Sequence, residues 1–369
     1  MRSGSKSLWF RASVMSCVVG LLVSGCSSSS KSSSSSTSAG GGSTVASGPA
    51  TSVKLILGWV VQPEYAGFFA AKSLGYYKAV GLNVTIQPGG PDVNTEQLVG
   101  AGTAPFGTDT YDNVLASNDA GTDLVSLAQL TSRSALRMIS LKKNHLTDPS
   151  SWKGKTIGVF ASDNPLYATF AKYGINPKKD VKLVDQGFDM SGFLSGKLDL
   201  ASGYTFNEVG QVIQGGIPAS QLNLYDFNAG GTATLQDQIF GNGAYVKAHP
   251  DVAAKLVAAS LKGWAYCRDN PQACVDIVAK AGAAIPKKFS LWQMNEFNQL
   301  MWPTANNLGY MDPSAFQKSA DILFQNKVIK KAPTISDFME TSIYNQAVGM
   351  LSGVDLKGAS YKPISGLTP

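Results

Sequence analysis

The sequence predicts an α/β protein of two lobes, each built on a doubly wound sheet, joined by a hinge. Short apolar, β-branched runs alternate with helix-like segments through the first two thirds of the body, which is the pattern of βαβ units and parallel sheets. The alternation stops and starts again at Ser150. The body, from Val53 to Pro369, is also long for a single hydrophobic core. Together these observations favour two α/β units over one large sheet.

The N-terminus has the three parts of a lipoprotein signal peptide. Arg2, Lys6 and Arg11 form a positive patch, and the apolar stretch after it, residues 12–23, is far shorter than the ~20 residues that span a bilayer. The small residues before Cys26 match a lipobox, in which that cysteine receives the lipid. Residues 1–25 are therefore predicted to be a signal peptide, in preference to an ordinary signal peptide followed by a chance cysteine.

Residues 26–52 are predicted to be the lipidated cysteine and a flexible tether, because they are almost entirely Ser, Gly, Thr and Ala. No later stretch is long and apolar enough to span a membrane. We therefore expect an exported protein, lipid-anchored to the outer face of the cytoplasmic membrane or periplasmic, that contacts the membrane through the Cys26 lipid.

The charge balance gives little reason to expect a nucleic-acid partner. The chain has a formal charge of +6, with 31 basic and 25 acidic residues, and three of the basic residues belong to the signal peptide. No basic run is interleaved with aromatic residues, as nucleic-acid binding would favour. A monomer without nucleic acid is expected.

The predicted strands and helices divide the body into two lobes. Lobe 1 is expected over residues 53–147 and 240–369, and lobe 2 over 148–239, with hinges near 145–150 and 235–245. The expected strands are 53–60, 82–86, 104–107, 124–128, a connecting strand 135–141, 156–160, 181–185, 198–203, 222–227 and 239–246. The expected helices are 66–74, 94–99, 112–120, 165–172, 190–195, one from 207, 250–267, 272–281, 291–301, 313–325 and 336–346.

Cys267 and Cys274 are the two cysteines of the body. The Asp-Asn-Pro break between them is expected to end one helix and begin another, which brings the thiols together. In an oxidising compartment a disulfide is the favoured interpretation. A metal site is disfavoured, because the only histidines, His145 and His249, are distant in sequence.

Signatures of catalysis are missing from the sequence. There is no phosphate-binding loop and no nucleophile elbow, and Gly100-Ala-Gly102 precedes a predicted strand, whereas a dinucleotide fingerprint follows one. We therefore expect a binding protein that is not an enzyme and that uses no cofactor.

Aromatic and carboxylate side chains gather in the loops that follow the predicted strands, where open α/β sheets bind ligands. An aromatic ring could stack a flat heteroaromatic solute, and a carboxylate could accept its N–H donors. The candidate ligand-binding residues are Trp59, Gln62, Glu64, Tyr65, Asp109, Thr110, Asn164, Phe188, Asp189, Tyr204, Asn207 and Glu208.

Some of these loop residues also have structural interpretations. Asp112 and Asp189 are candidates for helix N-caps, and for Asp112 the cap is the favoured role. Tyr65 is balanced between core packing and ligand contact. Glu208 is partly explained by the dipole of the helix that it begins. The run from Tyr204 to Glu208 is the strongest single candidate.

The body resembles the class II periplasmic binding proteins that serve ABC importers, the family that includes sulfonate, taurine and nitrate binders and binders of thiamine-pyrimidine precursors. The resemblance covers nearly the whole body. Its matching pieces are Trp59, Gly67-Phe-Phe-Ala-Ala71, Gly75-Tyr-Tyr77, Gly81-Leu-Asn-Val-Thr85, Pro88-Gly-Gly-Pro-Asp92, Gly100, Phe106-Gly107, Trp152-Lys-Gly-Lys-Thr-Ile-Gly-Val159, Gln186-Gly-Phe-Asp189, Tyr204, Asn207-Glu208, Gly263-Trp264 and Asn270-Pro271.

The resemblance implies the periplasmic-binding-protein type II fold and a small-molecule solute delivered to the transmembrane subunits of an ABC permease. Trp59 and Asn207-Glu208 are similar to the pyrimidine-precursor branch, where an aromatic stack and a carboxylate hold the ring. The stretches 88–92 and 186–189 resemble relatives assigned to riboflavin, and a sulfonate or taurine-type anion is the further alternative. Eukaryotic relatives that synthesise the pyrimidine carry a Cys-Cys-Cys-Phe-Cys run, which this chain lacks.

Overall fold

The computed structural model of the chain describes residues 49–160, 163–187 and 189–369. The predicted signal peptide, Cys26, most of the tether and Phe188 lie outside the described residues. Among the described helices, none combines the length and the apolar character needed to cross a membrane. The ordered body begins slightly earlier than expected, because Thr51 and Ser52 pair with Leu82 and Asn83.

The first sheet has five strands in the order β2-β1-β3-β10-β4. Its strands are β1 (Thr51–Ile56), β2 (Leu82–Gln87), β3 (Phe106–Asp109), β4 (Leu124–Gln129) and β10 (Gln238–Asn242). β1 pairs in parallel with β2 and β3, and β10 lies antiparallel between β3 and β4. The helices between its strands are a short 3-10 turn η1 (Pro63–Tyr65), α1 (Ala66–Ser73), α2 (Tyr76–Ala79), α3 (Thr95–Gly100) and α4 (Tyr111–Asp119).

The second sheet repeats this plan in the order β7-β6-β8-β5-β9. Its strands are β5 (Leu136–Leu141), β6 (Thr156–Val159), β7 (Lys182–Asp185), β8 (Leu200–Tyr204) and β9 (Leu222–Asp226). Its helices are α5 (Asn164–Lys172), α6 (Ser191–Leu194), α7 (Glu208–Gln214) and α8 (Phe227–Gly230). β6 is parallel to β7 and β8, while β5 is antiparallel to β8 and β9. The predicted α/β class and the two sheets are confirmed.

The crossing between the sheets differs from the expectation in one place. The strand expected to connect the lobes, residues 135–141, is a full member of the second sheet, where it pairs with β8 and β9. Its residues Leu136, Met138 and Ile139 are buried there. The chain therefore leaves the first sheet between Gln129 and Leu136, earlier than the expected hinge at 145–150. It returns between β9 and β10.

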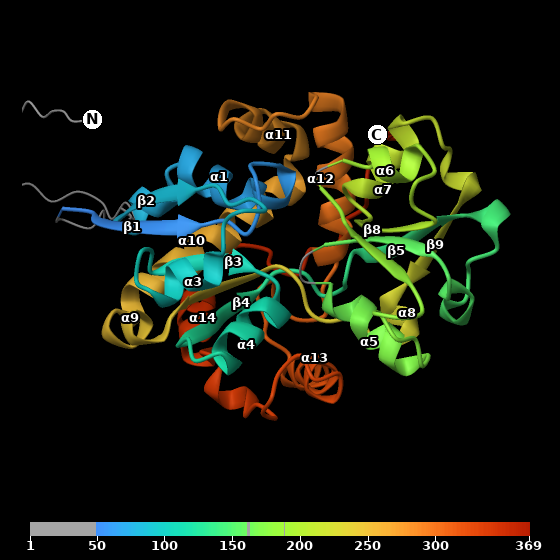
Figure 1. Cartoon of the computed structure of the whole chain (residues 1–369). Coiled ribbons are helices and arrows are strands. Elements are labelled where there is room, and N and C mark those ends of the chain that lie inside the picture. Colours follow the sequence, from blue (N-terminus) through green and yellow to red (C-terminus); the bar gives the residue numbers. More distant parts are fainter. Residues whose placement is uncertain (1–48, 161–162, 188) are drawn as a thin grey trace, which may run out of the picture. The chain divides into compact units, whose positions relative to one another are not determined.

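The segment from β10 onward adds helices that pack on the first sheet. They are α9 (Gly243–Ala248), α10 (Pro250–Asp269), α11 (Pro271–Lys280), α12 (Lys287–Met301), α13 (Pro313–Gln325) and α14 (Thr341–Gly349). Figure 1 shows α10 beside β1 and α1, and α12 running between the two sheets. The sequence did not predict α2, α8 and α9, which are only four to six residues long.

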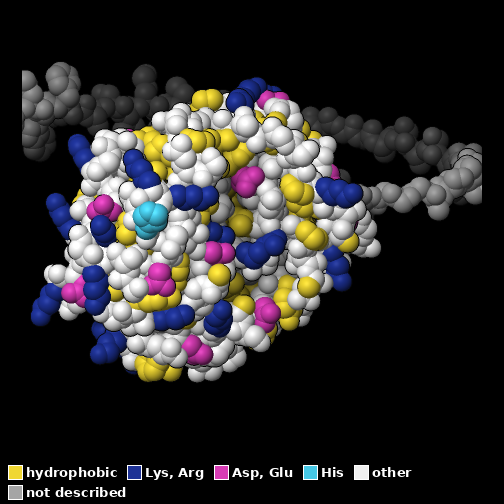
Figure 2. Space-filling model, turned by 90° about the vertical axis from the view of Figure 1, so that its right-hand side faces the viewer, with side chains coloured by type: hydrophobic (Ala, Val, Ile, Leu, Met, Phe, Trp, Pro, Cys, Tyr) yellow, Lys and Arg dark blue, Asp and Glu magenta, His cyan; other side chains and the backbone are white. Residues whose placement is uncertain are grey.

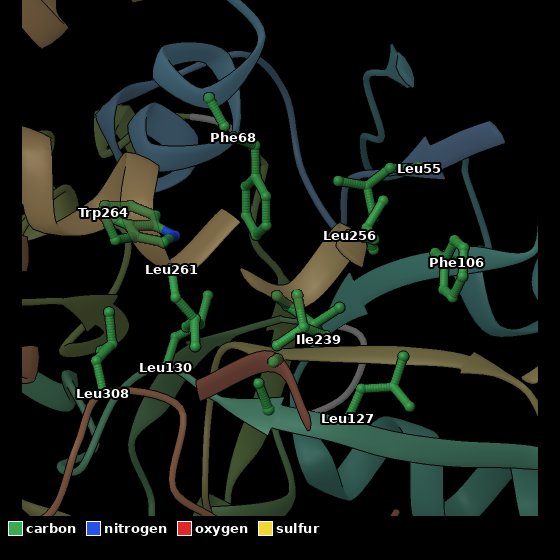
Figure 3. Packing of buried hydrophobic residues seen from close by; sticks show 14 of the residues in the cluster. Leu55, Phe68, Phe106, Leu127, Leu130, Ile239, Leu256, Leu261, Trp264 and Leu308 are labelled. Atoms are coloured by element: carbon green, nitrogen blue, oxygen red, sulfur yellow. The ribbon is translucent and has the colours of Figure 1, made fainter. Parts of the chain in front are cut away.

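The largest hydrophobic cluster lies under the first sheet. Figure 3 shows Phe68 and Trp264 facing each other, and their rings meet edge to face with centroids 6.0 Å apart. Helices α1 and α10 approach closely, since a Cβ on Gly263 would lie 2.0 Å from the Gly67 carbonyl oxygen. All described residues of the hydrophobic clusters lie between Val53 and Tyr361. The hydrophobic clusters of the described residues therefore lie entirely within the body.

Cys267 and Cys274 are both buried, at the end of α10 and in the first turn of α11. Their Cα atoms are 5.5 Å apart and the structure pairs the two sulfurs. Asn270 ends α10 and Pro271 begins α11, as the Asp-Asn-Pro break predicts.

Candidate functional site

The ends of strands from the two sheets meet at one junction. Asp112, in the first turn of α4 after β3, accepts a hydrogen bond of 2.8 Å from the side chain of Asn164, which begins α5 after β6. Gln293 of α12 donates to Gln62, which follows β1, at 3.4 Å, and to Asn207, which follows β8, at 3.3 Å. These contacts hold the strand-end loops of both sheets together.

Seven carboxylates surround this junction, and we refer to them as the carboxylate cluster: Glu64, Glu96, Asp109, Asp112, Asp163, Glu208 and Asp237. In the described part of the chain, none of the ion pairs involves a member of this cluster. The described residues also contain no group of His, Cys, Asp and Glu arranged to hold a metal ion. The junction is therefore rich in carboxyl groups that form no ion pair with a cation of the described residues.

On the side of the first sheet, four members of the cluster influence one another. Burial, followed by the charge of Asp237, raises the pKa of Glu64 well above its usual value, although Gln62 donates a hydrogen bond to Glu64. Burial raises the pKa of Asp237 to about 7 and that of Asp109 to about 6. Burial and the neighbouring Asp109 raise the pKa of Glu96 to about 9. Desolvation dominates, because a buried carboxylate loses its hydration when it ionises.

On the side of the second sheet, hydrogen bonds fix the carboxylates in place. Glu208 accepts from the Tyr204 backbone N–H at 2.8 Å and from the Asn207 side chain at 2.7 Å. Burial nevertheless raises the pKa of Glu208 to about 7. Asp163 accepts from the Ser202 hydroxyl, and burial raises its pKa to about 6.

Three oxygen atoms of the cluster have no hydrogen-bond partner among the described residues. They are Oε1 of Glu96, Oδ1 of Asp112 and Oδ1 of Asp163, and their residues are 6%, 3% and 2% exposed. Buried polar atoms are normally paired, and an unpaired one costs about 1–3 kcal/mol. These oxygens can accept hydrogen bonds from a bound molecule.

Aromatic rings lie beside the cluster. The Tyr204 ring is tilted by 33° against Phe160 with centroids 5.8 Å apart, and its pKa is raised by burial and then by Asp237 and Glu64. The half-buried Trp59 follows β1, and its carbonyl accepts the Gly89 N–H at 2.9 Å. Only glycine allows this approach, because a Cβ on Gly89 would lie 2.1 Å from the Leu57 carbonyl oxygen.

The structure brings most of the predicted site residues to the junction. Those with a hydrogen bond or a charge interaction there are Gln62, Glu64, Tyr65, Asp109, Asn164, Tyr204, Asn207 and Glu208. Tyr65 is buried in the main hydrophobic cluster, which is the core-packing role, and burial and the nearby Glu64 raise the pKa of its hydroxyl. Its contact with a ligand stays a prediction.

Asp189, Thr110 and Asp112 have roles that differ in part from the expectation. Asp189 is exposed and accepts the Ser191 N–H at 2.9 Å, while Met190 occupies the N-cap position of α6. The ligand contact of Asp189 stays a prediction. Thr110 occupies the N-cap position of α4, and its backbone N–H donates to Asp109 at 2.6 Å. The cap interpretation of Asp112 is therefore wrong, since Asp112 lies inside the helix and binds Asn164.

Sequence reasoning missed Glu96, Asp163 and Asp237 as members of the cluster. Asp163 stands next to the predicted Asn164, so its loop was identified although the residue was not. Glu96 follows the N-cap Asn94 and resembles an ordinary first-turn acid. Asp237 has a positive φ of 28°, uncommon for a residue other than glycine, and no motif indicates it.

Comparison with known proteins agrees with this geometry. The chain is 23% identical over 333 residues to the riboflavin-binding protein RibY of Chloroflexus aurantiacus, which covers 85% of this chain and 92% of that protein. It is 23% identical over 231 residues to the formylaminopyrimidine-binding protein of Halalkalibacterium halodurans, covering 62% of this chain and 69% of the relative.

Solved structures show the fold. The periplasmic aliphatic sulphonate-binding protein SsuA of Escherichia coli matches with a TM-score of 0.61 at 14% identity, covering 78% of this chain and 91% of SsuA. The periplasmic nitrate-binding protein NrtA of Synechocystis PCC 6803 matches with a TM-score of 0.63 at 15% identity, covering 82% and 89%. The predicted periplasmic-binding-protein type II fold is confirmed.

A family model described as NMT1/THI5 like matches residues 62–274, which include all seven members of the carboxylate cluster and both crossings between the sheets. Because this match spans more than half of the chain, the protein belongs to the NMT1/THI5-like family.

Proposed function

We propose that this protein is the solute-binding component of an ABC import system. In this proposal it is exported, anchored through a lipid on Cys26, and captures a small nitrogen-bearing heteroaromatic solute such as a thiamine pyrimidine precursor. Support comes from the fold, which it shares with periplasmic binding proteins, and from relatives named for riboflavin and formylaminopyrimidine. The transmembrane subunits of the permease are the proposed protein partner.

The carboxylate cluster is the single observation that carries the choice of solute. Four of its seven members are buried and the other three are half-buried, several oxygens lack partners, and none forms an ion pair in the described structure. An anion such as a sulfonate or nitrate would be repelled by these carboxylates. A solute with N–H donors or a positive charge would satisfy them.

Stacking supplies the second part of the proposed binding mode. Tyr204 lies within the electrostatic reach of Glu64, Asp112, Asp163 and Asp237, so a ring that contacts Tyr204 also meets the carboxylates. Stacked rings contribute about 0.5–1.5 kcal/mol beyond the burial of their area. We assign Tyr204 and Trp59 as the aromatic contacts, and Glu208 and Asp237 as acceptors for ring or exocyclic N–H groups.

Closure of the two lobes is the proposed means of capture. The Asp112–Asn164 hydrogen bond joins α4 to α5, and Gln293 joins loops of both sheets, so these contacts form only when the strand-end loops are together. A solute that bridges the carboxylates from both sides would favour the same arrangement. The permease would then recognise the closed protein.

Riboflavin is the second candidate, because the riboflavin-binding relative matches more of both chains than the formylaminopyrimidine-binding relative does. The two candidates differ in their response to pH. Burial raises the pKa of Glu208 and of Asp237 to about 7, so both are largely neutral at pH 5.5. A cationic solute requires the ionised forms, whereas the uncharged flavin does not.

The test is calorimetric titration of the body, residues 49–369, with a formylaminopyrimidine, thiamine, riboflavin, taurine and nitrate at pH 5.5 and pH 8. We expect an aminopyrimidine or thiamine to bind, and the permanently cationic thiamine to bind about tenfold or more tightly at pH 8. Glu208→Gln and Trp59→Ala should weaken binding, and Asp189→Asn, the matched surface control, should not. Binding of taurine or nitrate alone would refute the proposal, and binding of riboflavin with no pH dependence would support the second candidate.

A further inference from the structure

A group of lysines occupies one end of the second sheet, and we refer to it as the basic end. Its members are Lys142, Lys143, Lys153, Lys155, Lys178, Lys179, Lys182 and Lys197. Lys155 is half-buried, and the other seven are exposed. The aspartates at the same end are Asp148, Asp180 and Asp199. The basic end therefore carries eight positive charges against three negative ones.

Strand pairing explains why lysines so distant in sequence lie together. Thr156, at the start of β6, is paired with Lys182, at the start of β7. The next residue, Ile157, is paired with Leu200 at the start of β8, and Leu200 also pairs with Ser140 near the end of the antiparallel β5. The amino ends of the three parallel strands and the carboxyl end of β5 thus lie at the same end of the second sheet. The lysines precede or follow these strand ends.

The aspartates of this end are engaged in local structure. Asp199 accepts the Thr156 N–H at 2.9 Å and Asp148 accepts the Ser150 N–H at 2.8 Å. Asp180 accepts the Asn176 N–H at 2.9 Å and lies 3.6 Å from the Lys153 ammonium. Within the described chain, Lys153 is the only lysine of the basic end in an ion pair. The positive charge of this end is therefore turned outward.

The basic end is also separate from the candidate solute site. Asp163 and Glu208, the members of the carboxylate cluster on the second sheet, follow the carboxyl ends of β6 and β8, and the lysines lie at the amino ends of strands of the same sheet. Figure 2, which faces the side of the molecule formed by the second sheet, shows Lys and Arg side chains spread widely over that face with fewer Asp and Glu among them. The charges of this face are therefore spread over a broad surface.

We propose that the basic end docks on anionic lipid headgroups at the membrane surface. Lysines are compact point charges on flexible stems, and many of them dispersed over one face suit a flat, continuous negative surface. The biological setting rests on the proposed lipid anchor, which would keep the body within reach of the bilayer. The docking itself depends on the lysines alone, so it is testable without the anchor and without a solute.

The experiment is co-sedimentation of the body, residues 49–369, with two kinds of vesicle. One is pure phosphatidylcholine, and the other contains about 30% phosphatidylglycerol, which is anionic. The test variant is K142Q/K143Q/K178Q/K179Q. The matched control, K318Q/K327Q/K330Q/K331Q, removes the same charge from exposed lysines in and after α13, beside the first sheet. Retained thermal unfolding and solute binding show that both variants are folded.

The protein is expected to bind only the anionic vesicles and to be released at high salt, because salt screens surface charges. The test variant should lose more than about tenfold in partition coefficient and the control less than about twofold, since each lysine near an anionic surface contributes appreciably. Equal losses in the two variants would show a response to net charge alone and overturn the proposal. Absent binding, or equal binding to both kinds of vesicle, would overturn it as well. A failure here with intact solute binding would leave the proposed transport function standing.

Discussion

Replacing Glu208 with glutamine removes a buried ionisable group while nearly preserving the shape of the side chain. Burial raises the pKa of Glu208 to about 7, from a usual value near 4.5. The folded protein therefore holds a proton on Glu208 that the unfolded chain has already released. The contribution of Glu208 to the free energy of unfolding is fully present below pH about 4.5 and is lost as the pH rises through about 7. At about 1.4 kcal/mol per pH unit, the loss at pH 8 is about 3 kcal/mol.

The substitution also has a cost that does not depend on pH. Glu208 accepts hydrogen bonds from Tyr204 and Asn207 through its two oxygens, and glutamine presents an N–H₂ group in place of one of them. Asn207 cannot simply reverse its amide, because its oxygen accepts from Gln211 and Gln293. The lost hydrogen bond costs about 1 kcal/mol. Glu208→Gln should thus destabilise by about 1 kcal/mol at pH 4 and stabilise by about 2 kcal/mol at pH 8.

The assay is differential scanning calorimetry of the ligand-free body at the two pH values. For a body of this size, about 1 kcal/mol corresponds to about 1.5 °C in Tm. The Tm should fall by about 1–2 °C at pH 4 and rise by about 3 °C at pH 8. Glu340→Gln, the same chemical change beside β4, is the control and should show no such reversal. A fall in Tm of similar size at both pH values would refute the idea that burial keeps Glu208 protonated.

Three further predictions follow from contacts in the body. Asn164→Asp places a second carboxylate against Asp112, so Tm should fall by about 3 °C more at pH 8 than at pH 5, and a pH-independent fall would contradict this. The Tm of Cys267→Ser should be about 4 °C below that of the wild type without reductant, and equal to that of the wild type reduced with dithiothreitol. Calorimetry with and without dithiothreitol checks both comparisons. Gly263→Ala should destabilise by about 1–3 kcal/mol in urea unfolding, because the new methyl group meets the Gly67 carbonyl. Gly192→Ala is the control, because a Cβ at Gly192 would lie no closer than 3.2 Å to its neighbours. Equal losses of stability in the two variants would contradict the argument.

Much of the fold follows from local sequence patterns. The β-branched runs before each loop formed strands at or near their expected positions, because burial on both faces of a parallel sheet requires continuous apolar residues. The Asp-Asn-Pro break placed the boundary between α10 and α11 correctly, because proline starts a helix readily and cannot continue one. Short helices such as α2 and α8 were missed, because a single turn has too few residues to show a helical period.

The place of β5 shows where local patterns stop being informative. Its residues, 136–141, have the composition of a strand, and the sequence predicted one there. Which sheet it would join depends on partners more than fifty residues away, in β8 and β9. A pattern within the strand says nothing about such partners, so the expected crossing was placed about ten residues too late.

The sequence by itself determined the class of the fold, the loops that would carry the site, and the run from Tyr204 to Glu208. Only the tertiary structure decided which acids would gather. Asp237 comes from the return crossing and meets Asp109 because β10 pairs with β3, whereas Glu96 meets Asp109 because α3 packs beside β3. The physical reason is that burial and mutual repulsion, which raise the pKa values, depend on distances across the fold, and those distances are set by packing and not by neighbours along the chain.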